Sequence, residues 1–200
     1  HFFNPVPKMP LVEIVVGQKT TQETVASCLR YVGQIDKFPL KVKSAPGFLV
    51  NRILLPYMLE AIKLYQEGNS LELIDKAAES FGMPMGPIEL ADTVGLDVTL
   101  AALTSLRGAD AIPTIVQKMV NDGQLGKKSS RGFYEYKKNK PQKKEVSPSE
   151  KMYECQQRLC LSLCNEAVSA WREGIVESLD ELNAGSIFGF GFPPFRGGLM

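Results

Sequence analysis

The stretch Arg52-Ile-Leu-Leu-Pro-Tyr-Met-Leu-Glu-Ala61 returns in altered form as Arg158-Leu-Cys-Leu-Ser-Leu-Cys-Asn-Glu-Ala167. Each copy continues to a Glu-Gly pair, Glu67-Gly68 and Glu173-Gly174, and the separation between the copies stays at 106 residues. Two unrelated amphipathic helices would share their apolar spacing but not these arginine, glutamate and glycine positions. We therefore interpret the two stretches as a duplicated helical module whose second copy is cut short.

The likeness between the copies continues past these stretches. Ser70-Leu-Glu corresponds to Ser178-Leu-Asp, and Phe81-Gly-Met-Pro corresponds to Phe190-Gly-Phe-Pro. The separation grows to 108 and then to 109 residues, as small insertions would produce. A long amphipathic helix needs a partner surface for its apolar face, so we expect the two copies to pack on each other like the subunits of a dimer.

The first 45 residues follow a different pattern. Residues 11–16 are rich in β-branched side chains, residues 20–35 have helical spacing, and residues 38–43 alternate apolar and basic side chains. This order predicts a strand, a helix and a second strand. Such a unit is too small to be a domain alone, so we interpret residues 1–45 as the tail of an α/β domain whose front is missing. Glycine and proline signals then predict helices at about 71–80, 88–93, 98–106 and 114–122.

A lysine-rich segment separates the two helical copies. Residues 137–149 hold five lysines, two prolines and two serines but only one apolar residue, a composition typical of a solvated linker. We assign residues 46–136 to a first helical domain and residues 150–200 to a second, truncated helical repeat domain. The predicted fold class is mainly α, with two copies of one helical domain preceded by an α/β tail.

Composition limits the classes of partner. The 23 Lys and Arg residues balance 22 Asp and Glu residues, and this net charge of +1 argues against nucleic acid as the main partner. No apolar run approaches the roughly 20 residues that a transmembrane helix needs. The four cysteines follow no metal-ligand spacing, so we predict no metal site. Reduced, buried thiols are the favoured interpretation, which indicates a reducing compartment.

The chain has a single histidine, His1, and histidine is the side chain best suited to proton transfer near neutral pH. The following segment, residues 4–7, is a rigid extended turn that would hold the preceding side chain in place. A remnant of a purification tag is the alternative origin of His1. Glu13 interrupts an apolar strand, and a buried carboxylate needs a partner. Its simplest role would be to orient and stabilise an imidazole.

Two other polar features have both a structural and a functional interpretation. Asn51 lies early in the first repeat helix, where its amide either forms a terminal hydrogen bond or contacts a substrate. Lys127 and Lys128 lie in a turn, where they are either solvated or bind a phosphate. The chain contains no Gly-x-Gly-x-x-Gly turn for a nucleotide phosphate.

Several of these motifs resemble those of one enzyme family. His1-Phe-Phe-Asn-Pro-Val-Pro-Lys-Met-Pro-Leu-Val-Glu-Ile resembles the catalytic signature of the L-3-hydroxyacyl-CoA dehydrogenases. Pro46-Gly-Phe-Leu-Val-Asn-Arg-Ile-Leu-Leu-Pro-Tyr is similar to the helix that follows their nucleotide-binding domain, and further motifs match at Met83-Pro-Met-Gly-Pro and from Leu125-Gly-Lys-Lys to Gly-Phe-Tyr-Glu-Tyr. The closing Gly189-Phe-Gly-Phe-Pro-Pro-Phe-Arg-Gly-Gly resembles the second helical domain of multifunctional β-oxidation enzymes, including the α-subunits of fatty-acid oxidation complexes. The resemblance covers nearly the whole chain except the linker.

The resemblance implies a role for each candidate residue. His1 corresponds to the catalytic base and Glu13 to the carboxylate that pairs with it. Asn51 corresponds to a substrate-contacting amide. Asn4 corresponds to a position near the nicotinamide and Lys128 to a lysine near the cofactor. The chain departs from the family pattern in the turn after the lysine pair, where Ser130 replaces the usual glycine.

The resemblance also implies what the whole protein does. It would be an NAD-dependent oxidoreductase that converts 3-hydroxyacyl-CoA to 3-ketoacyl-CoA in fatty-acid β-oxidation, with residues 1–45 as the end of its Rossmann domain. The family's glycine-rich loop and catalytic serine would lie upstream of His1, so we expect this chain alone to be an inactive fragment that does not bind NAD measurably. Expected partners are the acyl-CoA substrate and either a thiolase subunit or further copies of the same chain. The bacterial cytoplasm, the mitochondrion and the peroxisome are all compatible compartments.

Two alternatives belong to other classes of protein. One is a non-catalytic helical scaffold or interaction module. The other is a single-function short-chain hydroxyacyl-CoA dehydrogenase or a related sugar-acid dehydrogenase. The duplication disfavours this second alternative, because a single-function enzyme needs one helical copy and dimerises instead.

Overall fold

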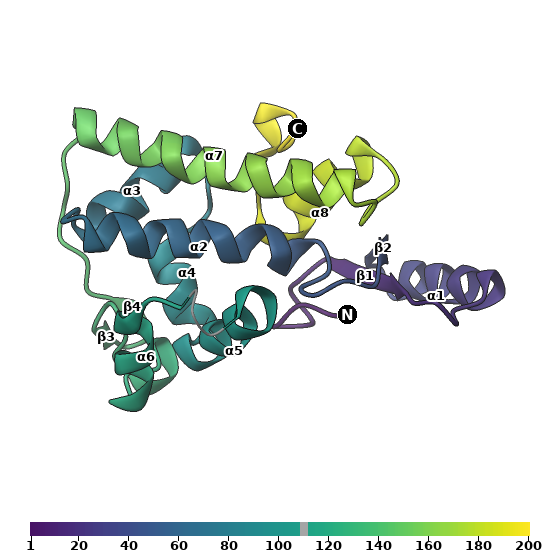
Figure 1. Ribbon diagram of the computed structural model, residues 1–200, viewed down its shortest axis with the longest axis horizontal. Helices are drawn as coiled ribbons and strands as arrows, with labels where there is room; N and C mark the ends of the chain where they lie inside the picture. The colour runs from purple at the N-terminus through teal and green to yellow at the C-terminus, as the bar shows by residue number, and fades with distance from the viewer. Residues whose placement is uncertain (109–111) are drawn as a thin grey trace. The chain divides into compact units, whose positions relative to one another are not determined.

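The computed structural model describes residues 1–108 and 112–200 of the chain (Figure 1). Within these ranges the chain divides into two compact units, one made of residues 1–54 and 164–200 and the other of residues 55–163. Two long helices, α2 (Val50–Gln66) and α7 (Glu150–Arg172), contribute residues to both units.

The first unit begins with two parallel strands joined by a helix. β1 (Leu11–Val16) and β2 (Phe38–Lys43) pair along their whole length, with Leu11 beside Phe38, and α1 (Gln22–Gln34) connects them (Figure 1). Five apolar side chains of the two strands are buried, namely Leu11, Val12, Ile14, Leu40 and Val42, and the β-branched ones among them favour strand over helix. The predicted strand–helix–strand unit is confirmed.

The last part of the chain completes the first unit. At the end of β2, the backbone nitrogen of Lys43 donates to the carbonyl oxygen of Ile175 at 2.8 Å. Helix α8 (Leu179–Phe190) follows and packs on both strands. It begins with a capping box, in which the hydroxyl of Ser178 accepts from the backbone nitrogen of Glu181 and the carboxylate of Glu181 accepts in return. A short 3₁₀ turn, η3, then precedes the end of the chain.

The second unit is made mainly of short helices that end at glycine or proline signals. Its elements beyond the α2 and α7 segments are α3 (Leu71–Phe81), α4 (Pro87–Val94), α5 (Leu96–Arg107), α6 (Thr114–Asn121), the 3₁₀ turn η2 (Lys127–Ser129) and the antiparallel hairpin β3 (Tyr136–Lys137) and β4 (Lys140–Pro141). The four helices that the sequence predicts in this region all occur, with slightly shifted ends. The mainly helical fold class is confirmed.

Within the first unit, the beginning of α2 is tied to the end of α7. Nε of Arg52 donates to Glu166 at 2.8 Å, and both terminal nitrogens of Arg52 donate to Glu173 at 2.7 Å. The side chain of Arg52 is only 14% exposed. The hydrogen bond to Glu173 is the largest influence on the pKa of Arg52 and raises it above its usual value, so the guanidinium keeps its charge despite partial burial.

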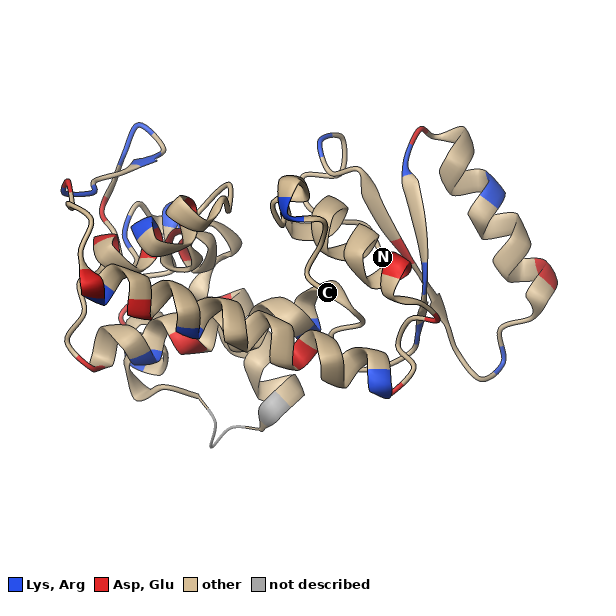
Figure 2. Ribbon diagram, turned by 90° about the horizontal axis from the view of Figure 1, so that it is seen from above, with Lys and Arg blue, Asp and Glu red and all other residues tan. Residues whose placement is uncertain are grey.

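Within the second unit, the same pairing recurs with the two helices exchanged. Arg158, the counterpart of Arg52 in the repeat, forms ion pairs with Glu60 at 2.6 Å and with Glu67. These two glutamates are the counterparts of the glutamates that bind Arg52. Positive and negative positions are accordingly interspersed along both helices (Figure 2). Such an exchange of partners is expected of two copies that pack on each other.

The prediction that residues 137–149 form a solvated linker is wrong at Lys143. Its ammonium nitrogen lies 3.0 Å from Asp75, 3.1 Å from Glu79 and 2.7 Å from Glu89. Burial by itself would lower the pKa of Lys143, but these carboxylates outweigh it, and the pKa is raised above its usual value. Composition could not reveal this contact, because all three partners lie far away in the sequence.

Asp92 anchors residues 133–136 inside the second unit. Its fully buried carboxylate accepts hydrogen bonds from the backbone nitrogens of Phe133 and Tyr134, each at 2.9 Å, and from the hydroxyl of Tyr136 at 3.2 Å. Burial is the largest influence on the pKa of Asp92 and raises it to about 6, against the opposing effect of these hydrogen bonds.

We expect the raised pKa of Asp92 to make the chain less stable as the pH rises. Between about pH 4 and about pH 6, the folded chain binds more protons at Asp92 than the unfolded chain does. The contribution of this proton binding to the free energy of unfolding is therefore complete below about pH 4 and is lost as the pH rises to about 6. The shift corresponds to at most about 3 kcal/mol. Urea unfolding of the wild type and of Asp92→Asn tests this: the stability difference between them should shrink from about pH 4 to about pH 7, and a pH-independent difference would contradict it.

Candidate active site

His1 and Glu13 lie side by side in the first unit. The backbone nitrogen of His1 donates to the carbonyl oxygen of Glu13 at 2.8 Å, and the backbone nitrogen of Glu13 donates back to His1 at 3.0 Å. An antiparallel bridge between Phe2 and Val12 continues this pairing. The side chains meet as well, because Nδ1 of His1 lies 2.7 Å from Oε2 of Glu13. The two residues that the sequence singles out are therefore in direct contact.

The carboxylate of Glu13 also binds the beginning of α2. Its second oxygen, Oε1, accepts hydrogen bonds from the backbone nitrogens of Leu49 and Val50, both at 3.0 Å. The first amides of a helix have no partners within the helix, and this end of a helix favours negative charge. Although Glu13 is fully buried, both of its oxygens therefore have partners. A single carboxylate on β1 links the imidazole of His1 to the first turn of α2.

Two aromatic rings hold the imidazole in place. The ring of His1 lies 4.6 Å from that of Phe3 and 5.3 Å from that of Phe48, measured between ring centres. Phe48 has a φ of 51°, in the left-handed region, and follows directly after Gly47. Asn51 comes in the first turn of α2, one residue after Val50, and is half-buried. The side chain of His1 remains 28% exposed, so a substrate group can reach it.

The hydrogen bond between His1 and Glu13 assigns the tautomer of a neutral imidazole. Because the carboxylate accepts at Nδ1, the proton is held there, and Nε2 carries the lone pair. A lone pair on a fixed, partly exposed ring can take a proton from a bound hydroxyl. The neighbouring carboxylate would then stabilise the imidazolium that forms. The arrangement is suited to general-base catalysis.

The other two candidates lie in exposed turns. Asn4 is exposed and precedes Pro5 through a cis peptide bond. Lys128 belongs to the second unit, and its ammonium nitrogen lies 2.6 Å from both carboxylate oxygens of Asp97. This hydrogen bond lowers the pKa of Asp97 below its usual value, so the two groups form an exposed ion pair. The roles of Asn4 and Lys128 stay predictions.

Ser130 occupies a backbone conformation that favours glycine. Its φ is 60° and its ψ is 6°, in the left-handed region, at the end of η2. A residue with a side chain pays about 1 kcal/mol or more for this conformation. Ser130 therefore keeps the left-handed turn although it lacks the conformational freedom of glycine, and this costs some backbone strain.

We expect Ser130→Gly to stabilise the chain by about 1 kcal/mol, because glycine relieves this strain. The matched control is Ser129→Gly, which should destabilise it. The hydroxyl of Ser129 accepts from the backbone nitrogen of Leu125 at 2.8 Å and lies 2.8 Å from the carbonyl oxygen of Arg131. Urea unfolding measures both variants, and equal effects of the two substitutions would contradict the strain argument.

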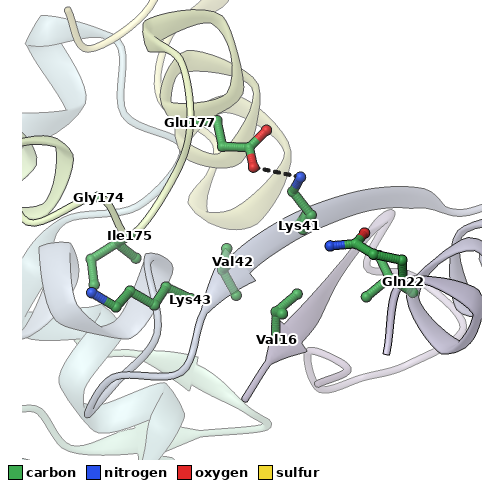
Figure 3. A pocket seen from close by; sticks show the side chains of 9 residues that line it. Val16, Gln22, Lys41, Val42, Lys43, Gly174, Ile175 and Glu177 are labelled. Carbon is green, nitrogen blue, oxygen red and sulfur yellow. Dashed lines mark ion pairs between the residues drawn. The ribbon is translucent and has the colours of Figure 1, made fainter. Parts of the chain in front are cut away.

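A separate hollow of about 220 Å³ opens on the first unit (Figure 3). Its lining residues come from β1, α1, β2 and the turn before α8, and they are Val16, Gln22, Val25, Lys41, Val42, Lys43, Gly174, Ile175 and Glu177. Lys41 forms an ion pair with Glu177 at 2.6 Å. The pKa of Glu173 is lowered mainly by its hydrogen bond with Arg52, and Lys43 makes a smaller contribution. The charge of Lys41 is therefore already matched by a carboxylate, which makes this lysine less available to an anionic ligand.

Other classes of site find no support in the ranges that the structure describes. Within residues 1–108 and 112–200, no group of three or more His, Cys, Asp and Glu side chains is arranged to hold a metal ion. The same residues include no helix that is long and apolar enough to cross a membrane. No disulfide joins the four cysteines. The prediction of buried thiols holds at Cys155 and is wrong at the exposed Cys28, and Cys160 and Cys164 are half-buried.

Two adjacent segments of the chain match domains of one protein family. Residues 1–45 match the 3-hydroxyacyl-CoA dehydrogenase, NAD binding domain, and residues 47–136 match the 3-hydroxyacyl-CoA dehydrogenase, C-terminal domain. Together these matches cover more than half of the chain. The chain belongs to the 3-hydroxyacyl-CoA dehydrogenase family. His1 and Glu13 lie in the segment that matches the first domain, and the backbone donors Leu49 and Val50 lie at the start of the segment that matches the second.

Solved structures of this family resemble the chain. The 3-hydroxybutyryl-CoA dehydrogenase of Escherichia coli is 26% identical with a TM-score of 0.80, and the match covers 96% of this chain and 60% of that one. The (S)-3-hydroxybutyryl-CoA dehydrogenase of Ralstonia eutropha is 43% identical with a TM-score of 0.64, over 69% of this chain and 51% of that one. The dehydrogenase part of multifunctional enzyme 1 from C. elegans is 30% identical with a TM-score of 0.64, over 99% of this chain and 49% of that one. The chain thus spans between 49% and 60% of the length of these relatives.

Sequence reasoning missed the two backbone donors at the site. The amides of Leu49 and Val50 have no side-chain signature, and a search for titratable residues passes over them. A signal was present in Pro46-Gly47, because such a pair ends an extended segment and a helix that follows it begins with unpaired amides. A buried carboxylate on a neighbouring strand is a natural partner for them.

Proposed function

We propose that this chain supplies the proton-transfer half of an NAD-dependent dehydrogenase that oxidises 3-hydroxyacyl-CoA to 3-ketoacyl-CoA. The observation that carries the proposal is the buried Glu13 carboxylate, which bonds Nδ1 of His1 on one side and the first turn of α2 on the other. Membership of the dehydrogenase family and the names of the solved relatives supply the substrate class.

The His1 end of the site fits a reaction that needs a nicotinamide cofactor. The imidazole is partly exposed beside the rings of Phe3 and Phe48, whereas the carboxylate that supports it is shielded from solvent. NAD⁺ supplies the hydride acceptor when it is bound. By the family resemblance, Asn4 would lie near the nicotinamide part and Lys128 near the cofactor.

The chain's own residues perform the proton transfer. Nε2 of His1 takes the proton of the substrate's 3-hydroxyl group while the hydrogen on C3 leaves as hydride, and the C3–O bond becomes a carbonyl. Glu13 stabilises the resulting imidazolium, and its two backbone donors keep the carboxylate in position. Asn51 would hold the substrate oxygen. General-base assistance of this kind contributes about 10²- to 10⁴-fold to the rate.

The proposal places the chain in a longer, multifunctional β-oxidation protein. The C. elegans dehydrogenase part matches 99% of this chain, including the second helical copy. A thiolase subunit or a second copy of the protein is the proposed partner. Arg52 and Arg158 each bind glutamates that belong to the other copy. These reciprocal contacts also support a structural role for the second copy, which would take the place of the second subunit of a dimer.

The test is an assay of the whole protein with NAD⁺ and 3-hydroxybutyryl-CoA. We expect NADH to form with this substrate and not with free 3-hydroxybutyrate, which lacks the CoA group. Absence of NADH formation from 3-hydroxyacyl-CoA substrates of short, medium and long chains would refute the proposed function.

A further inference from the structure

Helix α8 presents two glycines to the core of the first unit. Gly185 and Gly189 are four residues apart, so they lie on the same face of the helix, and both are buried. A Cβ atom on Gly189 would lie 2.5 Å from Cγ2 of Val50 and 3.0 Å from Cδ2 of Leu11. A Cβ atom on Gly185 would lie 2.7 Å from Cδ2 of Leu49. The helix can approach this closely only because both positions lack a side chain.

Two of the residues that these glycines approach, Leu49 and Val50, also hold the catalytic carboxylate. The amides of Leu49 and Val50 are the two donors to Oε1 of Glu13. Their side chains are 0% and 1% exposed, so they have no free space to move into. Val50 is β-branched and lies in a helix, which restricts its side chain to one preferred rotamer. A side chain at position 189 would therefore displace the first turn of α2 or α8 itself.

The turn before α8 fastens the same region from another side. It binds the end of β2 through the hydrogen bond from Lys43 to Ile175 and through the ion pair between Lys41 and Glu177 (Figure 3). Both the turn and α8 belong to the second helical copy. This copy therefore contacts the strand pair and the start of α2, the elements that carry Glu13 and its donors.

From these contacts we propose that Gly185 and Gly189 are positioning residues for the dehydrogenase reaction. Their missing side chains let α8 fix the first turn of α2, and through it the Glu13 carboxylate and the imidazole of His1. The second helical copy thereby becomes part of the catalytic apparatus rather than a spacer. This inference rests on the proposed function, because it assigns a role in that reaction.

The first test is Gly189→Ala in the whole protein. We expect turnover to fall by about 10- to 100-fold while KM changes by less than about threefold, because a displacement of about 1 Å at the base affects the transition state more than binding. The pH profile of turnover should change as well, since the base loses its carboxylate partner. The matched control is Gly33→Ala on α1, where a Cβ atom meets nothing within 4 Å. This control should leave turnover and its pH profile unchanged.

A second variant separates positioning from general destabilisation. Val50→Ala combined with Gly189→Ala removes both Val50 methyl groups, one of which is the closest neighbour of the new Cβ atom, and leaves only Cδ2 of Leu11 at 3.0 Å. Positioning predicts that the double variant regains most of the turnover that Gly189→Ala loses, since the backbone donor of Val50 remains. If the losses of the two single variants add instead, or if Gly189→Ala keeps full turnover and its normal pH profile, the inference is wrong.

A readout without activity distinguishes this inference from the proposed function. Because His1 is the single histidine of the 200-residue sequence, its ¹⁵N NMR signals in this chain report one imidazole. We expect the wild type and Gly33→Ala to hold the proton on Nδ1 of the neutral ring, and Gly189→Ala to show a mixture of tautomers. If Gly189→Ala shows a mixture of tautomers but the wild-type whole protein forms no NADH, the proposed function is refuted and the positioning role is kept. An unchanged tautomer in Gly189→Ala would refute the positioning role.

Discussion

Replacing His1 with glutamine is expected to lower the proposed dehydrogenase turnover of the whole protein by at least about two orders of magnitude. Glutamine can still donate a hydrogen bond to Glu13, but it cannot take a proton from the substrate's hydroxyl group. The affinity for NAD⁺ should stay nearly the same, because loss of a general base affects the transition state more than ground-state binding. Steady-state kinetics and cofactor titration on the same preparations measure both effects.

Lys8→Gln is the matched control for this substitution. It introduces the same side chain in the same N-terminal segment, at an exposed position. We expect its turnover to equal that of the wild type. Near-normal turnover in His1→Gln would exclude His1 as the base, and an equal loss in both variants would indicate a general disturbance of the segment.

The second large effect concerns the stability of the second unit. We expect Lys143→Met to destabilise the chain by about 3 kcal/mol, because it leaves the buried carboxylate of Asp75 and two further glutamates without their cation. Burial already raises the pKa of Asp75, and Lys143 is the main opposing influence. Methionine keeps much of the length of the lysine side chain, so the lost charge rather than lost packing decides the result.

Lys144→Met is the control for the second prediction. The side chain of Lys144 is exposed, and its contact with Glu72 runs through the backbone nitrogen, which the substitution retains. Its free energy of unfolding should differ from that of the wild type by less than about 0.5 kcal/mol. Urea unfolding that shows equal stability for the two variants would restore the solvated-linker interpretation for Lys143.

The elements that the sequence predicted well are those with a strong local pattern. Alternation and β-branching located β1 and β2, and helical spacing with glycine signals located the helices of the second unit. The polar positions of the repeat revealed the duplication, and the amphipathic pattern of its helices predicted that the two copies pack on each other. The contacts of Arg52 and Arg158 with glutamates of the other copy agree with this prediction. In each case the deciding information lies within one segment or in the comparison of two segments.

The contacts that the sequence did not predict are those between distant residues. Lys143 looks like any other lysine of a solvated run until Asp75 and Glu89 are placed beside it. The bonds of Glu13 to backbone amides have no side-chain signature, although its contact with His1 was expected. Gly185 and Gly189 drew no attention because a glycine reveals a close approach only when its neighbours are known. Packing decides these positions, and packing depends on the three-dimensional fold.

A double-variant cycle on His1 and Glu13 tests most directly whether the two residues act as one proton-transfer unit. Turnover in the proposed reaction is measured for the wild type, His1→Gln, Glu13→Gln and the double variant of the whole protein. If Glu13 acts only through the imidazole, the double variant should be no slower than His1→Gln, within about threefold, because residues that act as a unit give strongly non-additive losses. Losses that multiply would show that the two residues act independently, and would contradict the account.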